Sequence, residues 1–447
     1  MSIFTTRSIR DRSANVSSGS ERILRRIASM TVLAFLVISS SFAQISVSPI
    51  GTYESGIFDE SAAEIVGYDA GTQQLFVVNA NDGTLDVLNI SDPTTPVKAN
   101  TIVLPGDLAP NSVAVSRGVV IVAAEADPKQ DPGSALFYDT DGNLLNQLTI
   151  GALPDMVAVT PNGQYALFAN EGEPNDEYTN DPEGTVSIVS LRKKIDRLTQ
   201  ADVRTVSFTK FNAGPIDPDI RIFGPGATVA QDLEPEYIAI SGNSKTAWVV
   251  FQENNALAKI DIKNADATAL VALGFKDHSI PGNGLDTSND DSAINIVPRP
   301  IYGMYQPDAI AAFKTMGSEY VISANEGDAR EYIVEDEDEN EIEIFVEEAK
   351  LKDLSLDATA FPNAAALQTK AEAGNLRVTT TRGDTENDGD YEELYAFGAR
   401  SFSIWDGNGN LIFDSGDDIE VQTAAVIPAD FNSTNDENGS FDDRSDN

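Results

Sequence analysis

One stretch of the chain alternates oxygen-bearing side chains in the manner of a calcium-binding loop. It runs from Asp384 to Glu393 and has a glycine, Gly389, at its sixth position. Calcium takes about six to eight hard oxygen ligands, and the glycine permits the sharp turn that such a loop needs. The predicted ligands are Asp384, Glu386, Asp388, Asp390 and Glu392, with Glu393 as an alternative to the last. Because Tyr395 stands where an EF-hand has a bidentate glutamate, and no helical period flanks the loop, we expect an EF-hand-like loop outside an EF-hand.

A second group of acids belongs to a repeated phrase. The phrase is a proline, an acid or amide, one free residue and a short apolar run centred on alanine. It begins at Pro110, Pro154, Pro235 and Pro307, and its polar position holds Asn111, Asp155, Glu236 and Asp308. After each phrase the chain turns and re-enters as a second apolar strand, over residues 119–125, 165–171, 247–252 and 320–326. Each pair of strands predicts a β-hairpin, and each hairpin belongs to one repeat.

This repetition predicts an all-β fold, a β-propeller. The strands are short and β-branched, turns of Gly, Asn and Asp separate them, and no helical period is sustained across a repeat. Radial repetition of small antiparallel sheets explains the even spacing. Two further units, residues 64–90 and 391–406, match more loosely, so we expect six recognisable blades, and seven in the complete protein. The alternative is a β-sandwich with coincidental hairpins, which does not require the same phrase four times.

Polar residues stand where the predicted strands end. The second strands end at Asn79, Glu125, Asn170 and Glu171, Gln252 and Glu253, Asn325 and Glu326, and Arg400. Corresponding positions of successive blades point at one axial region, so we expect these residues to form a ring around one mouth of the channel. The candidate residues are Asp155, Glu171, Glu236, Asp308, Glu326, Arg330 and Arg400. The ring is a candidate site for a cation, or for a phosphate with a cation. The alternative is that these groups cap strand ends and satisfy one another across blades.

The first 43 residues differ from the rest and predict a secretory signal peptide. Six arginines precede an apolar run over residues 30–38, and Ser41, Phe42 and Ala43 form a small-residue cleavage site. The run is too short for a transmembrane span, and no second one follows. We therefore expect residues 44–447 to form one exported propeller domain, secreted or attached to the surface of a bacterial cell.

Composition excludes several classes of function. The formal net charge is −41, and the six arginines of the signal outnumber its two acids, so the mature chain is more acidic still. Such a surface repels nucleic acid and attracts divalent cations and basic partners. The acidic run over residues 335–343 predicts an exposed loop or hairpin tip. With no cysteine and a single histidine, His278, the chain has no thiol nucleophile and no Cys/His zinc site, and we expect His278 to be structural.

Several longer stretches resemble the choice-of-anchor I family. They are NEGDAR at residues 325–330, KDHS at 276–279, PGNGLD at 281–286, QENNA at 252–256 and FGARSFSIWD at 397–406. This family is similar to the mesenchyme-specific cell-surface glycoproteins of echinoderm skeleton-forming cells. The resemblance spans nearly all of residues 45–447. It implies a secreted bacterial β-propeller attached by variable C-terminal anchors, with relatives that are associated with biomineralisation and some that are labelled alkaline phosphatase.

The chain departs from that family at its end. Family members continue past the equivalent of residues 441–447 into another proline-acid phrase, one more blade and an anchor. This chain stops in a polar segment. The resemblance therefore implies that the domain is C-terminally incomplete, or that this is an unusually short member.

Two functions fit these observations. The first is a calcium-binding, non-catalytic surface protein that interacts with mineral or matrix. The second is a calcium-dependent phosphomonoesterase, a metal-dependent hydrolase in which carboxylates in the channel hold the metal that polarises the phosphate ester and activates water. An ordinary zinc alkaline phosphatase needs several histidines, which this chain lacks. An all-oxygen calcium site does not need them.

Overall fold

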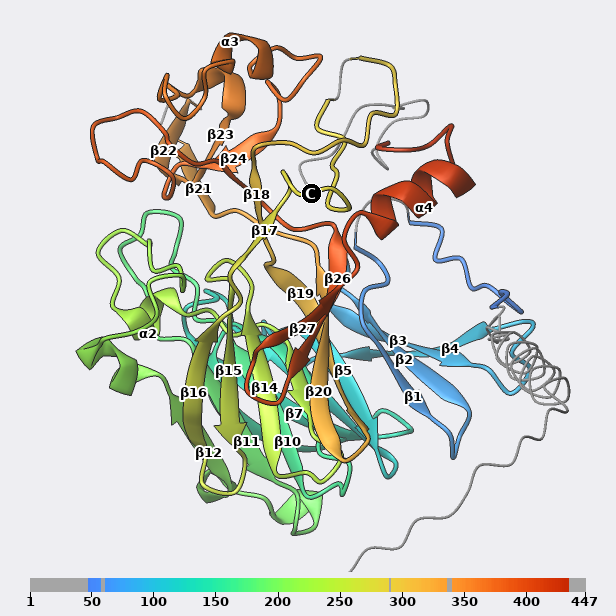
Figure 1. The fold of residues 1–447 in the computed structure, drawn as a ribbon. Helices are drawn as coiled ribbons and strands as arrows, with labels where there is room; N and C mark the ends of the chain where they lie inside the picture. Colours follow the sequence, from blue (N-terminus) through green and yellow to red (C-terminus); the bar gives the residue numbers. More distant parts are fainter. Residues whose placement is uncertain (1–46, 58–60, 289–290, 336–339, 434–447) are drawn as a thin grey trace, which may run out of the picture. The chain divides into compact units, whose positions relative to one another are not determined.

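The computed structural model, drawn in Figure 1, describes residues 47–57, 61–288, 291–335 and 340–433. The chain divides into residues 1–50 and residues 51–447. In the first unit the described residues, 47–50, have no regular secondary structure. The expected signal peptide, residues 1–43, and the polar segment at residues 441–447 lie outside the described residues. All elements named below belong to the second unit.

The described residues contain five four-stranded antiparallel sheets, here called sheets 1 to 5 in chain order. Their strands are β1 (Val66–Asp69), β2 (Gln74–Asn79), β3 (Thr84–Asn89) and β4 (Val97–Val103) in sheet 1; β5 (Ala109–Ser116), β6 (Val119–Glu125), β7 (Pro132–Asp139) and β8 (Leu144–Ala152) in sheet 2; β9 (Pro154–Val159), β10 (Tyr165–Asn170), β11 (Thr185–Ser190) and β12 (Val203–Ser207) in sheet 3; β13 (Ile238–Ile240), β14 (Thr246–Phe251), β15 (Ala256–Asp261) and β16 (Asp266–Ala272) in sheet 4; β19 (Pro307–Thr315), β20 (Ser318–Asn325), β26 (Ser401–Asp406) and β27 (Leu411–Asp414) in sheet 5.

Neighbouring sheets pack face to face through apolar side chains. Successive residues of a strand point to opposite faces, so one strand can contribute to two cores. In β6, Val122 packs with Phe76 of sheet 1, whereas the preceding Ile121 packs with Phe168 of sheet 3. Sheets 3 and 4 share a third cluster, and Trp248 of sheet 4 packs with Trp405 of sheet 5 in a fourth. These strands are continuous apolar runs because both of their faces are buried.

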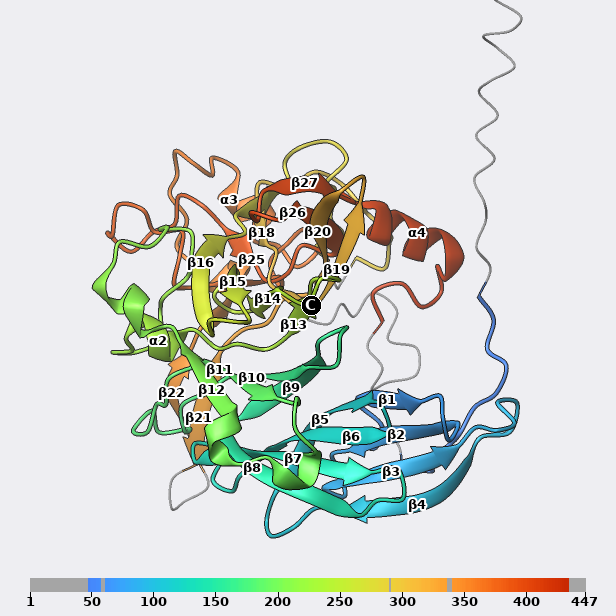
Figure 2. The ribbon, with the colours of Figure 1, turned by 90° about the horizontal axis from the view of Figure 1, so that it is seen from below.

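The first strands of the sheets adjoin one another in chain order. Strand β1 lies beside β5, β5 beside β9, β9 beside β13, and β13 beside β19. Figure 2 shows the five sheets following one another in the same order. The repeated phrase lies in three of these first strands, β5, β9 and β19, and leads into a fourth, β13. The fold is therefore all-β, with repeated four-stranded antiparallel sheets, and is consistent with a propeller-like architecture.

The prediction of six blades is wrong for the described residues. Residues 64–90 do form part of sheet 1, but residues 391–406 do not make a separate sheet. Their strand β26 is the third strand of sheet 5 and pairs with β20, with Asn325 opposite Ser401. Residues 326–400 lie between the second and third strands of sheet 5. The third strand is therefore far from the second in sequence, and residues 391–406 were mistaken for a separate blade.

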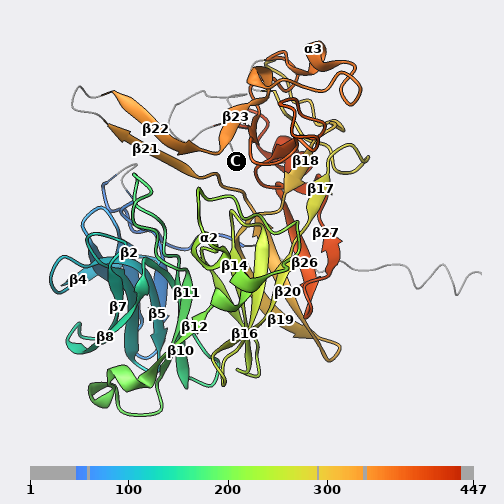
Figure 3. The same cartoon turned by 90° about the vertical axis from the view of Figure 1, so that its left-hand side faces the viewer.

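Residues 326–400, here called the insertion, form structure of their own. Strands β21 (Glu331–Glu335) and β22 (Glu341–Val346) pair as a hairpin, as predicted for the acidic run, and its tip at residues 336–339 lies outside the described residues. A five-stranded sheet joins strands of the insertion to two strands from the link between sheets 4 and 5. In order these strands are β17 (Phe275–Asp277), β18 (Tyr302–Met304), β25 (Tyr395–Ala396), β24 (Arg377–Thr379) and β23 (Glu348–Lys350). Figures 1 and 3 show the hairpin and this sheet together, beyond one end of the four-stranded sheets.

The helices of the described residues are short. The α-helices are α2 (Val229–Asp232), α3 (Ala364–Leu367) and α4 (Asp418–Val426), and the 3₁₀ turns are Ile195–Arg197, Gln200–Asp202, Thr209–Ala213 and Leu351–Asp353. None of the helices in this part of the chain is long and apolar enough to cross a bilayer.

Packing between sheets should dominate stability. We expect Phe168→Ala to lower the free energy of unfolding by about 3–5 kcal/mol, because the side chain is fully buried between sheets 2 and 3 and its loss leaves a cavity. The control is Phe313→Ala, which removes the same ring from a site that is 39% exposed and should cost less than about 1 kcal/mol. Urea denaturation followed by circular dichroism measures both. Equal losses for the two variants would contradict the packing described above.

Candidate functional site

Three carboxylates of the predicted calcium loop lie together. One ligand oxygen each from Asp384, Asp388 and Glu392 can be chosen so that all lie within 4.8 Å of one another. No other group of three or more Asp, Glu or His residues meets this criterion in the described part of the chain. The structure therefore brings together three of the five predicted ligands.

Backbone hydrogen bonds shape this loop. The carboxylate of Asp384 accepts from the backbone N–H groups of Asp388 and Gly389, both at 3.1 Å. Gly389 has φ of 98°, a backbone conformation that favours glycine, as the sixth position of a calcium loop requires. Glu392 Oε2 accepts from both the backbone and the hydroxyl of Thr385 at 2.7 Å. The first and last acids are thus fixed by hydrogen bonds within the loop.

The other predicted ligands of the loop lie beside this group or outside it. The backbone N–H of Asp390 donates to Asp388 Oδ1 at 3.4 Å. A side-chain hydrogen bond with Asp388 raises the pKa of Asp390 to about 6, and the charge of Asp388 adds to this effect. Glu386 is exposed and is not one of the three. Glu393, the alternative last ligand, accepts a hydrogen bond from the Tyr395 hydroxyl at 2.6 Å.

The polar residue of the repeated phrase occupies a β-bulge. In sheets 2, 3 and 5 the ladder skips one residue of the first strand, and the skipped residues are Asn111, Asp155 and Asp308. In sheet 4 the N–H of Glu236 and the carbonyl of Tyr237 both bond to Val250, so two residues face one. Sheet 1 has the same arrangement, with Glu64 and Ile65 facing Val78. A bulge of this kind re-aims a side chain, which here is a polar one in every sheet.

The bulges of the five sheets meet at one cavity of about 300 Å³. Its lining includes Glu64, Asn111, Asp155, Tyr237 and Asp308, one from each sheet at or next to the bulge. Sequence reasoning missed Glu64 because its repeat lacks the proline. Its place just before an apolar strand was the available signal.

The acids that follow the second strands lie close to the bulge residues. Glu171 follows β10 in sheet 3, and Glu253 follows β14 in sheet 4 after Gln252. The charges of Asp155 and Glu253 raise the pKa of Glu171, although burial is the larger cause. Glu326 of sheet 5 likewise has its pKa raised by burial and then by Asp308 and Asp328. The predicted ring residues of sheets 3, 4 and 5 are thus electrostatic neighbours.

Four of these acids form what we call the buried carboxylate cluster: Asp155, Glu171, Glu236 and Glu253. Burial raises the pKa of Asp155 and of Glu253 to about 7, and it raises the pKa values of Glu171 and Glu236 well above the ordinary range. Neighbouring carboxylates add to the effect in each case. Asp155, Glu171 and Glu236 are partly exposed, and Asp155 lines the cavity, whereas Glu253 is buried. Protein surrounds all four side chains on most sides.

Neither predicted arginine is free to bind a ligand at this cluster. Arg330 donates to Asp232 Oδ1 at 2.6 Å and pairs with Glu234 Oε2 at 2.6 Å. It still lowers the pKa of Glu253 through its charge, against the larger effect of burial. Arg400 lies elsewhere, with Glu420 at 3.4 Å and Asn432 at 3.1 Å. Sequence reasoning did not find Asp232 and Glu234, which precede the phrase of sheet 4 and bind Arg330 across a long sequence separation.

The amides at the strand ends serve their own sheets. Asn170 donates to Thr185 and Ser187 of the next strand, and Asn325 donates to Ser401 and Ser403. These two amides are satisfied at strand ends, as in the alternative interpretation, but by the neighbouring strand of the same sheet and not across blades. His278 is also buried, and its Nδ1 lies 2.8 Å from the carbonyl oxygen of Asn283, as expected of a structural histidine.

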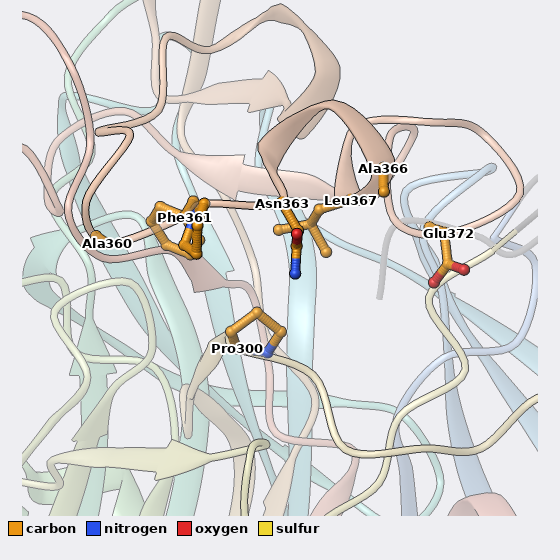
Figure 4. Close-up of a pocket in the computed structure, with 8 residues that line it drawn as sticks. Pro300, Ala360, Phe361, Asn363, Ala366, Leu367 and Glu372 are labelled. Carbon is orange, nitrogen blue, oxygen red and sulfur yellow. The ribbon is translucent and has the colours of Figure 1, made fainter.

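A second cavity, of about 400 Å³, is lined by residues of the insertion and by Pro300 and is shown in Figure 4. Phe361, Leu367 and Pro300 form its apolar wall, and the amide of Asn363 points into it. Its carboxylate, Glu372, is paired with Arg299. This cavity shares no residue with the loop or with the buried carboxylate cluster.

Repeated four-stranded sheets with polar bulges at corresponding positions define an all-β repeat protein. The choice-of-anchor I domain matches residues 64–447, and the chain belongs to this family, which confirms the family resemblance. Choice-of-anchor domains are typically parts of exported surface proteins. The similarity to mesenchyme-specific glycoproteins stays a prediction.

Other comparisons add little. No functionally curated protein matches the chain. Among solved structures it is similar to the hydrazine synthase of Kuenenia stuttgartiensis, at 13% identity and a TM-score of 0.30, over 63% of this chain and 82% of that one. It is also similar to a protein of unknown function from Bacteroides caccae, at 9% identity and a TM-score of 0.30, over 59% of this chain and 70% of that one. We draw no function from either.

The cluster should make stability depend on pH. A carboxyl group whose pKa is raised on folding keeps a proton that the unfolded chain releases, so the folded state loses stability as pH rises through the folded pKa. For Glu253 a rise from 4.5 to about 7 corresponds to about 3 kcal/mol. In a chelating buffer we therefore expect the thermal midpoint to fall between about pH 5 and pH 8.

Two glutamine variants separate this effect from general repulsion on an acidic surface. The thermal midpoint of Glu253→Gln should fall less than that of the wild type over the same pH range, because residue 253 no longer titrates. Glu331→Gln, at an exposed position, should follow the wild type. If all three proteins show the same pH dependence, the cluster does not carry it.

Proposed function

We propose that this chain is a calcium-binding, non-catalytic surface protein that interacts with mineral or matrix. The proposal depends on the convergence of the carboxylates of Asp384, Asp388 and Glu392 within 4.8 Å. Carboxylate, carbonyl and water oxygens suit calcium, which accepts irregular geometry with about six to eight ligands. The loop is partly exposed, so water and a partner's oxygens can complete the coordination.

The acidic composition supports the same function. With a formal net charge of −41, the protein attracts divalent cations over a large surface. A calcium ion held at an exposed loop can also bridge to carboxylate, phosphate or carbonate groups of a partner. Family membership fits export to the cell surface, where calcium is available.

We also propose that sheets 1 to 5 are blades of a β-propeller. Two observations support this architecture. Consecutive first strands adjoin each other, and the bulge regions of all five sheets line a single cavity. In a propeller the first strands of the blades surround the axis, so a shared cavity is expected there.

The arginine contacts favour binding over phosphate hydrolysis. Phosphoryl transfer needs positive charge, from a metal or from Arg and Lys, against the developing transition state. Arg330 is bonded to two carboxylates, and Arg400 lies with Glu420 and Asn432. The alternative, a calcium-dependent phosphomonoesterase, finds support only in the acids of the cavity, such as Asp155 and Asp308.

Removing loop ligands should weaken calcium binding. We expect Asp384→Ala combined with Asp388→Ala to lower calcium affinity and to lower the thermal midpoint measured in calcium. An ion that binds only the folded state stabilises it by mass action, by about 3 kcal/mol at a concentration 100 times the dissociation constant. Calorimetric titration and thermal melts, each with and without chelator, measure the two effects.

Asp406→Ala is the matched control for that experiment. Asp406 also accepts backbone hydrogen bonds in a polar turn, from Asn408 and Asn410, but it belongs to no group of three acids in the described residues. Its loss should leave the calcium-dependent shift of the midpoint unchanged. Identical calcium responses of the double variant and the wild type would rule out the loop as a binding site.

A phosphatase assay separates the two functions. We expect the purified protein to hydrolyse p-nitrophenyl phosphate no faster than a blank, in calcium or in chelator, because no arginine is among the residues that line the cavity and Arg330 is bonded to carboxylates. The observation that would favour the enzyme is a calcium-dependent rate that falls in Asp155→Asn, since Asp155 lines the cavity.

A further inference from the structure

Two oxygens of the buried carboxylate cluster have no hydrogen-bond partner in the described part of the chain. They are Oε2 of Glu236 and Oε2 of Glu253, and both atoms are buried. The Glu253 residue is only 6% exposed. A buried polar atom without a partner costs free energy, and a buried carboxylate costs more than a neutral group. A cation bound at these two oxygens would lower this cost.

The protein's own cations do not supply it. Arg330 is bonded to Asp232 and Glu234, and Arg221 is paired with Glu347. Arg221 reaches Glu253 as well, but it donates to the backbone carbonyl at 2.6 Å and not to the side chain.

Lysine does not compensate the cluster either. Lys129, whose pKa the charge of Glu171 helps to raise, is paired with Glu173. The cations that interact with this region in the described residues thus already have carboxylate partners. In the described residues, none of these cations is paired with a side chain of the cluster.

The cluster offers only oxygen ligands. Glu171, Glu236 and Glu253 come from the ends of neighbouring sheets, and Asp155 opens onto the cavity, from which water can complete a coordination shell. Zinc prefers histidine and cysteine, but the chain has no cysteine and its one histidine, His278, is bonded to Asn283. Magnesium demands nearly ideal octahedral geometry, whereas calcium accepts irregular sets of oxygens.

We propose that Glu171, Glu236 and Glu253, with Asp155, bind a calcium ion inside the protein, at a site separate from the loop at residues 384–392. The proposal does not depend on the function proposed for that loop. The cluster is wider than the loop, because its oxygens do not form a group of three within 4.8 Å. Binding of one ion therefore requires rotation of the three glutamate side chains, so that their carboxylate oxygens approach one another.

Equilibrium dialysis of the full chain against calcium, followed by thermal melts, tests the proposal. The wild type should bind one ion at each of the two sites. The loop variant, with Asp384→Ala and Asp388→Ala, should keep the internal ion. Glu236→Gln combined with Glu253→Gln should keep the loop ion and bind the other about tenfold or more weakly, since ligand charge sets calcium affinity.

Folding of the glutamine variant can be checked separately. Glutamine keeps the shape of glutamate and removes the buried charge, so in chelator this variant should melt no lower than the wild type. Glu331→Gln, at an exposed position, should bind calcium as the wild type does.

The outcomes distinguish the two sites. If the loop variant loses all tight calcium binding, the internal site is overturned and the function proposed for the loop stands. If instead the glutamine variant loses all of it, the internal site stands and the loop fails. If the glutamine variant in chelator melts well below the wild type, the carboxylates stabilise the fold without a metal, and the proposal is also overturned.

Discussion

Burial of both faces of the sheets that pack between two neighbours, such as sheets 2 and 3, is the constraint on which the rest of the structure depends. Every residue of β10 is buried, and in β6 neighbouring residues such as Ile121 and Val122 pack against different sheets. Such sheets have little room for unpaired polar groups, because each one would be desolvated without a partner. Polar side chains are therefore displaced to the strand ends. The acids gather there because the faces of the sheets are closed to them.

The repeated phrase places a polar side chain at the end of a strand, where it can point away from the buried faces. Each phrase lies in the first strand of its sheet or, in sheet 4, leads into it, and this strand is an edge strand, so a proline there breaks no ladder between strands. The next residue is the extra residue of a bulge, which re-aims its side chain away from the apolar faces. Sheet 1 lacks the phrase but has the same bulge. The five bulges bring Glu64, Asn111, Asp155 and Asp308 to one cavity, with Tyr237 beside the bulge residue Glu236.

Local features could be predicted from the sequence, and distant pairings could not. The phrase located the first strands of four sheets, and the spacing of Asp384, Asp388 and Glu392 sufficed because their contacts lie within one turn. The blade count failed because nothing in the phrase tells that residues 326–400 separate two strands of one sheet. The partners of Arg330 were missed for the same reason. Asp232 and Glu234 come near it only through the fold.

The two sets of carboxylates differ in what surrounds them, so the calcium sites proposed at them would have different roles. Around the loop, water screens the repulsion between acids, and backbone N–H groups of Asp388 and Gly389 stabilise the Asp384 carboxylate directly. If the loop binds calcium as proposed, such a site would tolerate the loss of the ion, so it could respond to the calcium concentration and exchange with a partner. Inside the protein, one carboxylate oxygen each of Glu236 and Glu253 is buried and has no hydrogen-bond partner in the described residues. The calcium ion proposed there would offset a desolvation cost that the fold otherwise carries, so it would act as part of the folded structure, whereas the proposed loop site would act at the surface.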